Sequence, residues 1–134
     1  MSEYLSKISL PTADIFIDAE DFLWIKWKEN AEFTLEMAKK HESAIVEISQ
    51  GKKRLFILDV RVNYSYVDPE ARRYMAKSEP VNQLRHAQAI LSNSLGARLM
   101  MNFYMKIDKP PVPMKLFSNE DAAKKWLKQF LPNP

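Results

Sequence analysis

Two short β-rich runs open the hydrophobic pattern of this chain. Residues 15–17 (Ile-Phe-Ile) and 22–28 (Phe-Leu-Trp-Ile-Lys-Trp-Lys) are joined by residues 18–21, three of which are acidic. A polar connector of this length predicts a hairpin, so we expect the sheet to begin with an antiparallel pair. Residues 54–60 are apolar at both alternating positions, which is typical of a strand covered on both faces and predicts the central strand.

Two helices are predicted in the first half of the chain and just after its middle. In residues 35–49 the apolar side chains share one stripe, Thr34 stands at the N-cap position, and Gly51 stands where a left-handed residue ends a helix. Residues 69–77 begin with a proline, which suits the first helical position, and Asp68 is suited to be their N-cap.

The last third of the chain alternates strands and helices again. Residues 86–92 and 114–117 are predicted strands, and residues 95–107 form a predicted helix that is apolar nearly all round. Three prolines within residues 108–113 end that helix. Residues 118–121 run from Ser to Asp with the spacing of a capping box, and they predict the start of an amphipathic last helix.

The predicted order of elements is β-β-α-β-α-β-α-β-α. Strands that alternate with helices imply parallel βαβ units, so we interpret the chain as an α/β protein with a single mixed sheet. Its 134 residues and 46% apolar content suit one domain over residues 1–134, with an ordered core of about 13–131. We expect the first dozen residues and residues 132–134 to be loose.

The composition excludes several classes of function. A chain without cysteine has no disulfide scaffold, cysteine-ligated metal or thiol catalysis, and two glycines cannot form a glycine-rich phosphate loop. No apolar stretch approaches the ~18 residues of a membrane span and no signal-peptide pattern opens the chain, so we expect a cytoplasmic protein. Basic residues are scattered, apart from residues 52–54 in a predicted solvated turn, and we expect no nucleic-acid partner.

Signatures of catalysis and metal binding are also missing from the sequence. The two histidines have no second ligand at a metal-binding spacing; we expect His41 at the surface and His86 as a polar residue of a strand. We therefore predict no metal, no cofactor and no catalytic residue. An enzyme of unknown reaction, the least favoured alternative, would need His86 or Asp59 to meet a second polar group in a cleft.

Several segments together carry a family resemblance over most of residues 13–131. They are Leu55-Phe-Ile-Leu-Asp59, Asp68-Pro-Glu-Ala-Arg-Arg73, Ala89-Ile-Leu-Ser-Asn-Ser-Leu95-Gly-Ala-Arg98, Pro110-Pro111, Lys115-Leu-Phe117 and Glu120-Asp-Ala-Ala-Lys-Lys-Trp-Leu127. In order and spacing the chain resembles the small bacterial STAS-like proteins, similar in fold to the sporulation anti-sigma-factor antagonist and more distantly to CRAL-TRIO lipid carriers. The resemblance implies a STAS-like fold and a non-enzymatic regulatory or binding module.

The chain departs from this family at its regulatory switch. In STAS antagonists the helix after the central strand opens with an Asp and a phosphorylatable Ser or Thr. Here the corresponding residues are Asp68, Pro69 and Glu70, so the position holds a proline followed by a fixed negative charge. We do not carry the phospho-switch over to this chain. The nearest hydroxyl, that of Ser65, is displaced from the motif.

A first candidate site follows from the predicted sheet. Ligands of open α/β sheets usually bind beyond the carboxyl ends of the parallel strands. Asn93 and Ser94 precede a predicted helix there and Arg98 lies one turn inside it, so a small anion could bind at the free helix N–H groups. The simpler interpretation is that Ser94 caps the helix and Gly96 permits close packing.

A second candidate site follows from the methionine-rich helix. A helix with more than one apolar face lies deep in a core or presents an adaptable surface. We expect a self-association surface or the lip of an apolar pocket, unless these methionines simply pack under loops. The residues concerned are Met101, Tyr104, Met105, Tyr64, Tyr66 and residues 110–113, which include Pro110 and Pro111. The sequence thus predicts a module that acts through protein partners as a homodimer, or alternatively a carrier of a small apolar ligand or lipid.

Overall fold

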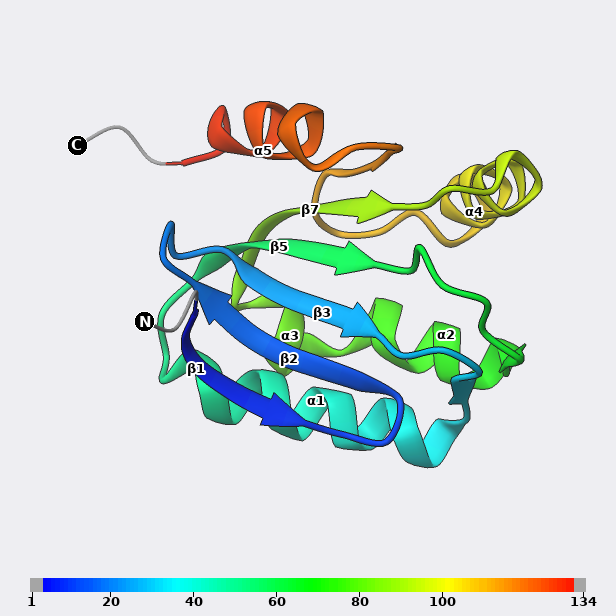
Figure 1. Cartoon of the computed structure of the whole chain (residues 1–134), viewed down its shortest axis with the longest axis horizontal. Helices are drawn as coiled ribbons and strands as arrows, with labels where there is room; N and C mark the ends of the chain where they lie inside the picture. Colours follow the sequence, from blue (N-terminus) through cyan, green and yellow to red (C-terminus); the bar gives the residue numbers. More distant parts are fainter. Residues whose placement is uncertain (1–3, 132–134) are drawn as a thin grey trace.

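A six-stranded mixed sheet forms the centre of the molecule (Figure 1). The structure is a computed structural model that describes residues 4–131. In spatial order the strands are β1 (Tyr4–Ser9), β2 (Ala13–Asp18), β3 (Leu23–Trp27), β5 (Arg54–Asp59), β7 (Arg85–Leu91) and β8 (Met114–Phe117). The β1–β2 and β2–β3 pairs are antiparallel, and β3, β5, β7 and β8 run parallel. The α/β class and the mixed sheet with an antiparallel beginning are therefore confirmed.

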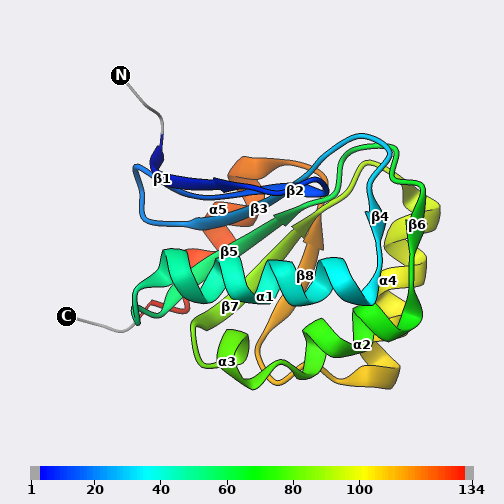
Figure 2. The same cartoon turned by 90° about the horizontal axis from the view of Figure 1, so that it is seen from below.

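The helices cover the two faces of the sheet unequally (Figure 2). On one face lie α1 (Leu35–Ser49), α2 (Pro69–Lys77) and the short α3 (Glu79–Asn82), whereas α5 (Glu120–Lys128) covers the other. The helix α4 (Leu95–Asp108) lies beyond the carboxyl end of β7, away from the centre of the sheet (Figure 1). Two short strands, β4 (Glu32–Phe33) and β6 (Tyr66–Val67), form a separate parallel pair.

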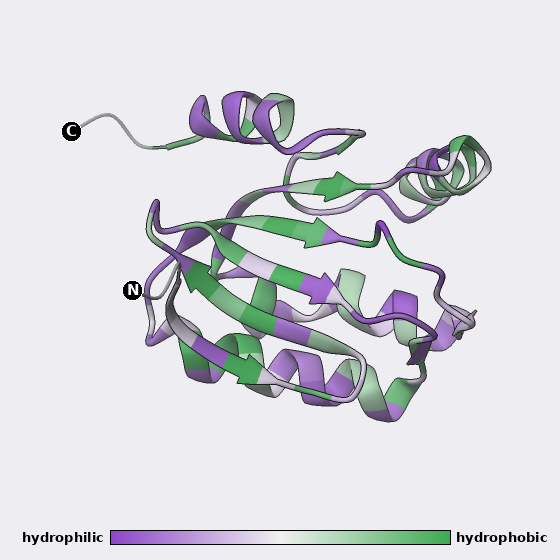
Figure 3. Ribbon diagram, in the orientation of Figure 1, coloured by the Kyte–Doolittle hydropathy of each residue, from purple (hydrophilic) through white to green (hydrophobic). Residues whose placement is uncertain are grey.

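The strand β5 is the interior strand that the sequence predicts. It pairs with β3 on one side and β7 on the other, and the successive residues Phe56 and Ile57 are both fully buried. Phe56 belongs to the core under α1, and Ile57 belongs to the core under α5. Figure 3 shows hydrophobic residues along the central strands, as expected for strands that are covered on both faces.

Local capping signals set the helix starts. Thr34 Oγ1 accepts a hydrogen bond from Met37 N at 3.3 Å, and Asp68 Oδ1 accepts one from Glu70 N at 3.0 Å, so both predicted N-caps are confirmed. The predicted capping box at 118–121 is wrong by one position. Asn119 is the N-cap of α5, with its Oδ1 accepting from Ala122 N at 2.8 Å.

Four short elements, β1, β4, β6 and α3, were not expected from the sequence. The predicted looseness of the first dozen residues is wrong for β1, because its backbone completes the edge of the sheet by pairing with β2. The β4–β6 pair and α3 are too short to leave a periodic pattern. Residues 132–134, which were also expected to be loose, lie outside the described part of the chain.

Candidate ligand-binding cavity

An apolar cavity of about 200 Å³ lies between the α1 side of the sheet and the helices that cover it. Its floor is formed by β3, β5, β7 and β8, and its walls by α1, α2 and α3, with α4 at one end. The side chains that line it are Ile25, Trp27, Phe33, His41, Ile45, Leu58, Val60, Tyr64, Val67, Arg72, Met75, Ala76, Val81, Arg85, Gln88, Ile90, Met101, Tyr104, Met105, Asp108, Pro110 and Met114. Most are aliphatic, aromatic or thioether groups, which suits a small and mainly apolar molecule.

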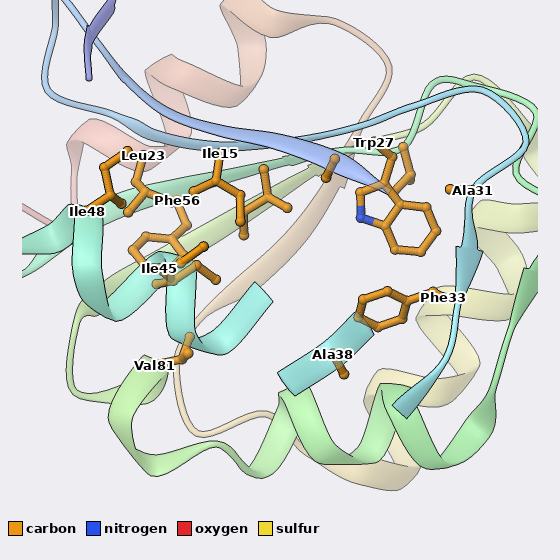
Figure 4. Packing of buried hydrophobic residues seen from close by; sticks show 14 of the residues in the cluster. Ile15, Leu23, Trp27, Ala31, Phe33, Ala38, Ile45, Ile48, Phe56 and Val81 are labelled. Carbon is orange, nitrogen blue, oxygen red and sulfur yellow. The ribbon is translucent and has the colours of Figure 1, made fainter. Parts of the chain in front are cut away.

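Aromatic rings form the wall near the β4–β6 pair. Trp27 packs against Phe33 with ring centroids 5.0 Å apart, and its other neighbour, Tyr64, meets it edge-on at 5.3 Å. Figure 4 shows Trp27 and Phe33 next to each other at one end of the buried cluster, with Ile15, Ile45 and Phe56 at the other. Rigid rings at contact distance hold this wall in one shape.

The helix α4 closes the cavity without being buried itself. Met101, Tyr104 and Met105 are half-buried and line the cavity, while none of the fourteen residues of α4 is fully buried. One link ties α4 to α2. Arg72 forms an ion pair with Asp108, and the Arg72 guanidinium lies 4.1 Å from the centre of the Tyr104 ring. A cover attached by few contacts can open more easily than an element of the core.

Arg85 is a buried cation in the cavity wall. Its side chain is 4% exposed, and burial lowers its pKa to about 10, which still leaves it charged at neutral pH. The two Nη atoms donate to the side-chain oxygens of Gln88, at 2.6 Å, and Asn82, whereas Nε has no partner among the described residues. All its hydrogen-bond partners are therefore neutral amides.

A β-bulge explains why Arg85 faces the cavity. Arg85 pairs with Arg54 but Ala87 pairs with Leu55, so β7 contains one more residue than β5 at this point. In regular alternation Arg85 would share a face with Ala87, which packs on the α5 side. The extra residue, His86, turns Arg85 to the face of Gln88, and bulges commonly redirect a side chain in this way.

His41 is buried, and the expectation that it lies at the surface is wrong. It is 2% exposed on the inner side of α1, because this residue shares the helical face of the apolar stripe. Its Nε2 lies 2.7 Å from Thr12 Oγ1, and its ring meets the Phe33 ring edge-on at 4.9 Å. Burial lowers its pKa from 6.5 to about 4, so the imidazole in the cavity wall is uncharged at neutral pH.

A second donor in the wall is unused. Trp27 is 7% exposed, and its Nε1 is buried without a hydrogen-bond partner among residues 4–131. A buried N–H group without a partner costs roughly 1–3 kcal/mol. The cavity thus holds two donors, on Trp27 and Arg85, that the described protein does not satisfy.

The structure brings together part of the predicted apolar site. Tyr64, Met101, Tyr104, Met105 and Pro110 all line the cavity, although they come from two separate segments, the loop before β6 and the stretch formed by α4 and the residues just after it. Tyr66 is 51% exposed and does not line the cavity, nor does the exposed Pro111 of the same predicted set.

The three residues of the predicted anion site, Asn93, Ser94 and Arg98, lie at the start of α4 in different surroundings. Ser94 is the N-cap of α4, and its Oγ accepts from Ala97 N at 3.1 Å. Asn93 is exposed and lies beside Asp59 and Arg61 in a shallow hollow. Arg98 is half-buried, and its Nε has no partner among the described residues. None of the three lines the central cavity.

The two groups named for a possible catalytic cleft lie apart. Asp59 ends β5 and receives two hydrogen bonds from the Arg61 side chain, at 3.0 and 2.9 Å. His86 lies near the other end of the same sheet, where burial and then the charge of Lys53 lower its pKa. Within residues 4–131, His, Asp and Glu side chains form no group of three that could hold a metal ion.

Sequence reasoning missed the polar residues of the cavity: Arg85, Gln88, His41 and Trp27. A charged residue at the start of an apolar strand, as in Arg85, was the available signal. Its face depends on the bulge, which leaves no trace in the hydrophobic pattern. His41 follows two lysines, and that neighbourhood suggested solvent.

None of the helices within residues 4–131 has the length and apolar character needed to cross a membrane.

Comparisons with known proteins place the chain in a family. No curated protein matches the sequence. The chain is similar in structure to an uncharacterized protein of the DUF3478 family with a SpoIIAA-like fold from Shewanella loihica PV-4, with a TM-score of 0.52 and 11% identity, over 95% of this chain and 98% of that one. The predicted STAS-like fold is thereby confirmed.

The model of one protein family covers nearly all of the sheet and its helices. It is described as a domain of unknown function, DUF7793, and it matches residues 15–131. This span contains every residue of the cavity wall. The chain therefore belongs to the DUF7793 family and has a SpoIIAA-like, STAS-type fold.

Proposed function

We propose that this protein binds a small, mainly apolar molecule in the central cavity. The observation that carries the proposal is an apolar space of about 200 Å³ whose wall contains two buried donors without partners. Close packing and satisfied polar groups are the rule in protein interiors. A ligand that fills the space and accepts a hydrogen bond from a donor would supply both the missing packing and a missing hydrogen-bond partner.

The construction of α4 supports entry of a ligand. Methionine side chains adapt their shape to different apolar partners, and Met101 and Met105 face the cavity from a helix without buried residues. Opening α4 would break mainly the Arg72–Asp108 pair and the apolar contacts beneath it. The function is binding and release, in agreement with a non-enzymatic module.

The direct test uses a neutral apolar probe. In protein labelled with ¹³C at the methionine methyl groups, 1-octanol should shift the Met101, Met105 and Met75 signals saturably at submillimolar concentration. Ala76→Leu places three more carbon atoms in the cavity wall and should weaken binding by about tenfold or more. The matched control is Ala19→Leu, the same change at an exposed position, which should leave binding unchanged. Unshifted methionine signals in the unsubstituted protein would refute the proposal.

A second candidate function is self-association through the outer face of α4. Leu95, Leu99, Phe103 and Ile107 repeat every four residues, and each is more than half exposed. Such a row is apolar enough to pair with the same row of a second copy in a twofold dimer. Light scattering should then give twice the monomer mass, and Leu99→Glu with Phe103→Glu should return it to the monomer. A monomeric unsubstituted protein at high micromolar concentration would exclude this function.

A further inference from the structure

A buried positive charge without a negative partner lies in the wall of the cavity. Arg85 is 4% exposed, and it donates only to the amide oxygens of Gln88 and Asn82. No ion pair within residues 4–131 includes it. An arginine keeps its proton at neutral pH, and a buried charge is costly unless an anion pairs with it. The described protein leaves this charge unbalanced.

The other charged residues of the wall do not supply the missing anion. Arg72 and Asp108 pair with each other, and the neutral imidazole of His41 adds no charge. The lining of the cavity therefore carries one net positive charge, and it is located on Arg85. A ligand that balances it carries one negative charge.

The free donor of Arg85 indicates the shape of that anion. Nε has no partner, and each Nη atom carries a second hydrogen besides the one that its amide partner accepts. The free N–H groups of the planar guanidinium lie side by side, and two of them can donate to the two oxygens of one carboxylate. A phosphate monoester brings about two negative charges and three acceptor oxygens at neutral pH, more than one arginine satisfies.

We infer that the ligand of the cavity is a medium-chain monocarboxylate, with its carboxylate paired to Arg85 and its hydrocarbon tail among the apolar side chains toward α4. This inference rests on the proposed function and names its ligand class. The space of about 200 Å³ suits about eight carbon atoms, since an apolar cavity of about 150 Å³ takes up benzene. Arg85 lies at the amino end of β7 and α4 beyond its carboxyl end, so the tail runs along the strands.

Two probes of equal length separate the anchor from the cavity. Isothermal titration at pH 7.5 compares octanoate with 1-octanol, which differ in the charged end and share the tail. A hydrogen-bonded charge should make octanoate bind roughly ten- to a hundredfold more tightly. Equal affinities would overturn the carboxylate anchor and leave the proposed function intact. Binding of neither probe would overturn both.

A pair of variants then tests Arg85 itself. Arg85→Met combined with Gln88→Leu removes the charge together with its buried amide acceptor, while Asn82, the other acceptor, is only half-buried. Octanoate should fall to the affinity of 1-octanol, while 1-octanol changes by less than threefold. Arg73→Met, on an exposed arginine of α2, lowers the net charge equally and should keep the preference for octanoate.

The preference for octanoate over 1-octanol should also depend on the positive charge at position 85. Arg85→Lys keeps one positive charge and should retain part of the preference for octanoate over 1-octanol, with the fork geometry lost. Folding of each variant is checked by the methionine methyl spectrum before titration. An unchanged octanoate preference in a folded Arg85→Met, Gln88→Leu protein would overturn the inference.

Discussion

Similar polar side chains have hydrogen-bond and ion-pair partners on one face of the sheet and lack them on the other. On the α5 face, Trp24 Nε1 donates to Asp18 Oδ2 at 2.8 Å, and Lys124 forms ion pairs with Asp18, Glu20 and Glu120. On the α1 face, the Trp27 Nε1 and Arg85 Nε donors have no partner in the described chain. An indole and a cation are therefore satisfied on one face and not on the other.

This difference indicates where the molecule is built for stability and where for binding. The α5 face has a closed core in which Ala89, Leu91 and Leu127 are fully buried. The α1 face has a comparable core around Phe56 and Ile45, but toward α4 it opens into the cavity. Proteins break the rules of packing and polar satisfaction chiefly at functional sites, and the open face fits that rule.

The largest expected contrast is in the cost of truncating an apolar side chain. Leu127→Ala removes a fully buried side chain from the α5 core and should lower the free energy of unfolding by about 3 kcal/mol. Met101→Ala, at the half-buried edge of the cavity, should cost about 1 kcal/mol or less, since less contact is lost. Urea unfolding measures both. Equal losses would mean that the cavity face is packed as tightly as the other.

The second contrast is in pH dependence, which should come mainly from the cavity face. The pKa of His41 is about 4 in the folded protein and 6.5 in the unfolded chain. Between these values the unfolded chain binds more protons, so stability is complete above pH 6.5 and falls as the pH falls. The loss should reach about 2 kcal/mol at pH 5, before the carboxyl groups titrate.

Urea unfolding between pH 7.5 and pH 5 measures this slope. His41→Gln should flatten most of it. His86→Gln is the control, because burial also lowers the pKa of His86, but that side chain is only half-buried. A slope that disappears with His86 and survives the loss of His41 would contradict the assignment.

The third contrast is in the sign of the change in the free energy of unfolding when a cation is removed from each face. Arg85→Met with Gln88→Leu replaces an unbalanced buried charge by apolar groups and should raise the free energy of unfolding of the ligand-free protein by about 1 kcal/mol. Lys124→Met leaves Asp18 without its cation and Glu20 with Lys128 alone, and it should lower the free energy of unfolding by about 1 kcal/mol. Thermal unfolding of both variants shows the signs directly. Destabilisation by the Arg85 substitution pair would show that the charge is balanced within the protein.

The smallest contrast compares the two indoles. Trp24→Phe and Trp27→Phe remove the same atoms, but only the first breaks a hydrogen bond. Trp24→Phe should therefore cost about 1 kcal/mol more than Trp27→Phe in urea unfolding. Equal costs would mean that the Trp27 N–H group is satisfied in solution.

Secondary structure could be predicted wherever a local signal was sufficient. Thr34 and Asp68 start their helices as expected because a capping side chain bonds backbone only two or three residues away. The missed strand β1 forms because its backbone pairs with the edge of β2, and no local sequence pattern predicts that pairing. Part of the apolar site was also within reach, since methionines on more than one face of α4 already indicated an adaptable surface.

The sequence by itself determined the α/β alternation of the main strands and helices, the buried central strand β5 and the loss of a phosphorylatable residue after Asp68, because each follows from side-chain pattern over a few neighbouring residues. Only the tertiary structure decided that Arg85 and Trp27 face one cavity and that His41 is buried there. These facts depend on a bulge in β7 and on the meeting of α1, α2 and α4, which join residues far apart in the chain. Burial and charge balance are properties of that assembly, so they become visible only when the chain is folded.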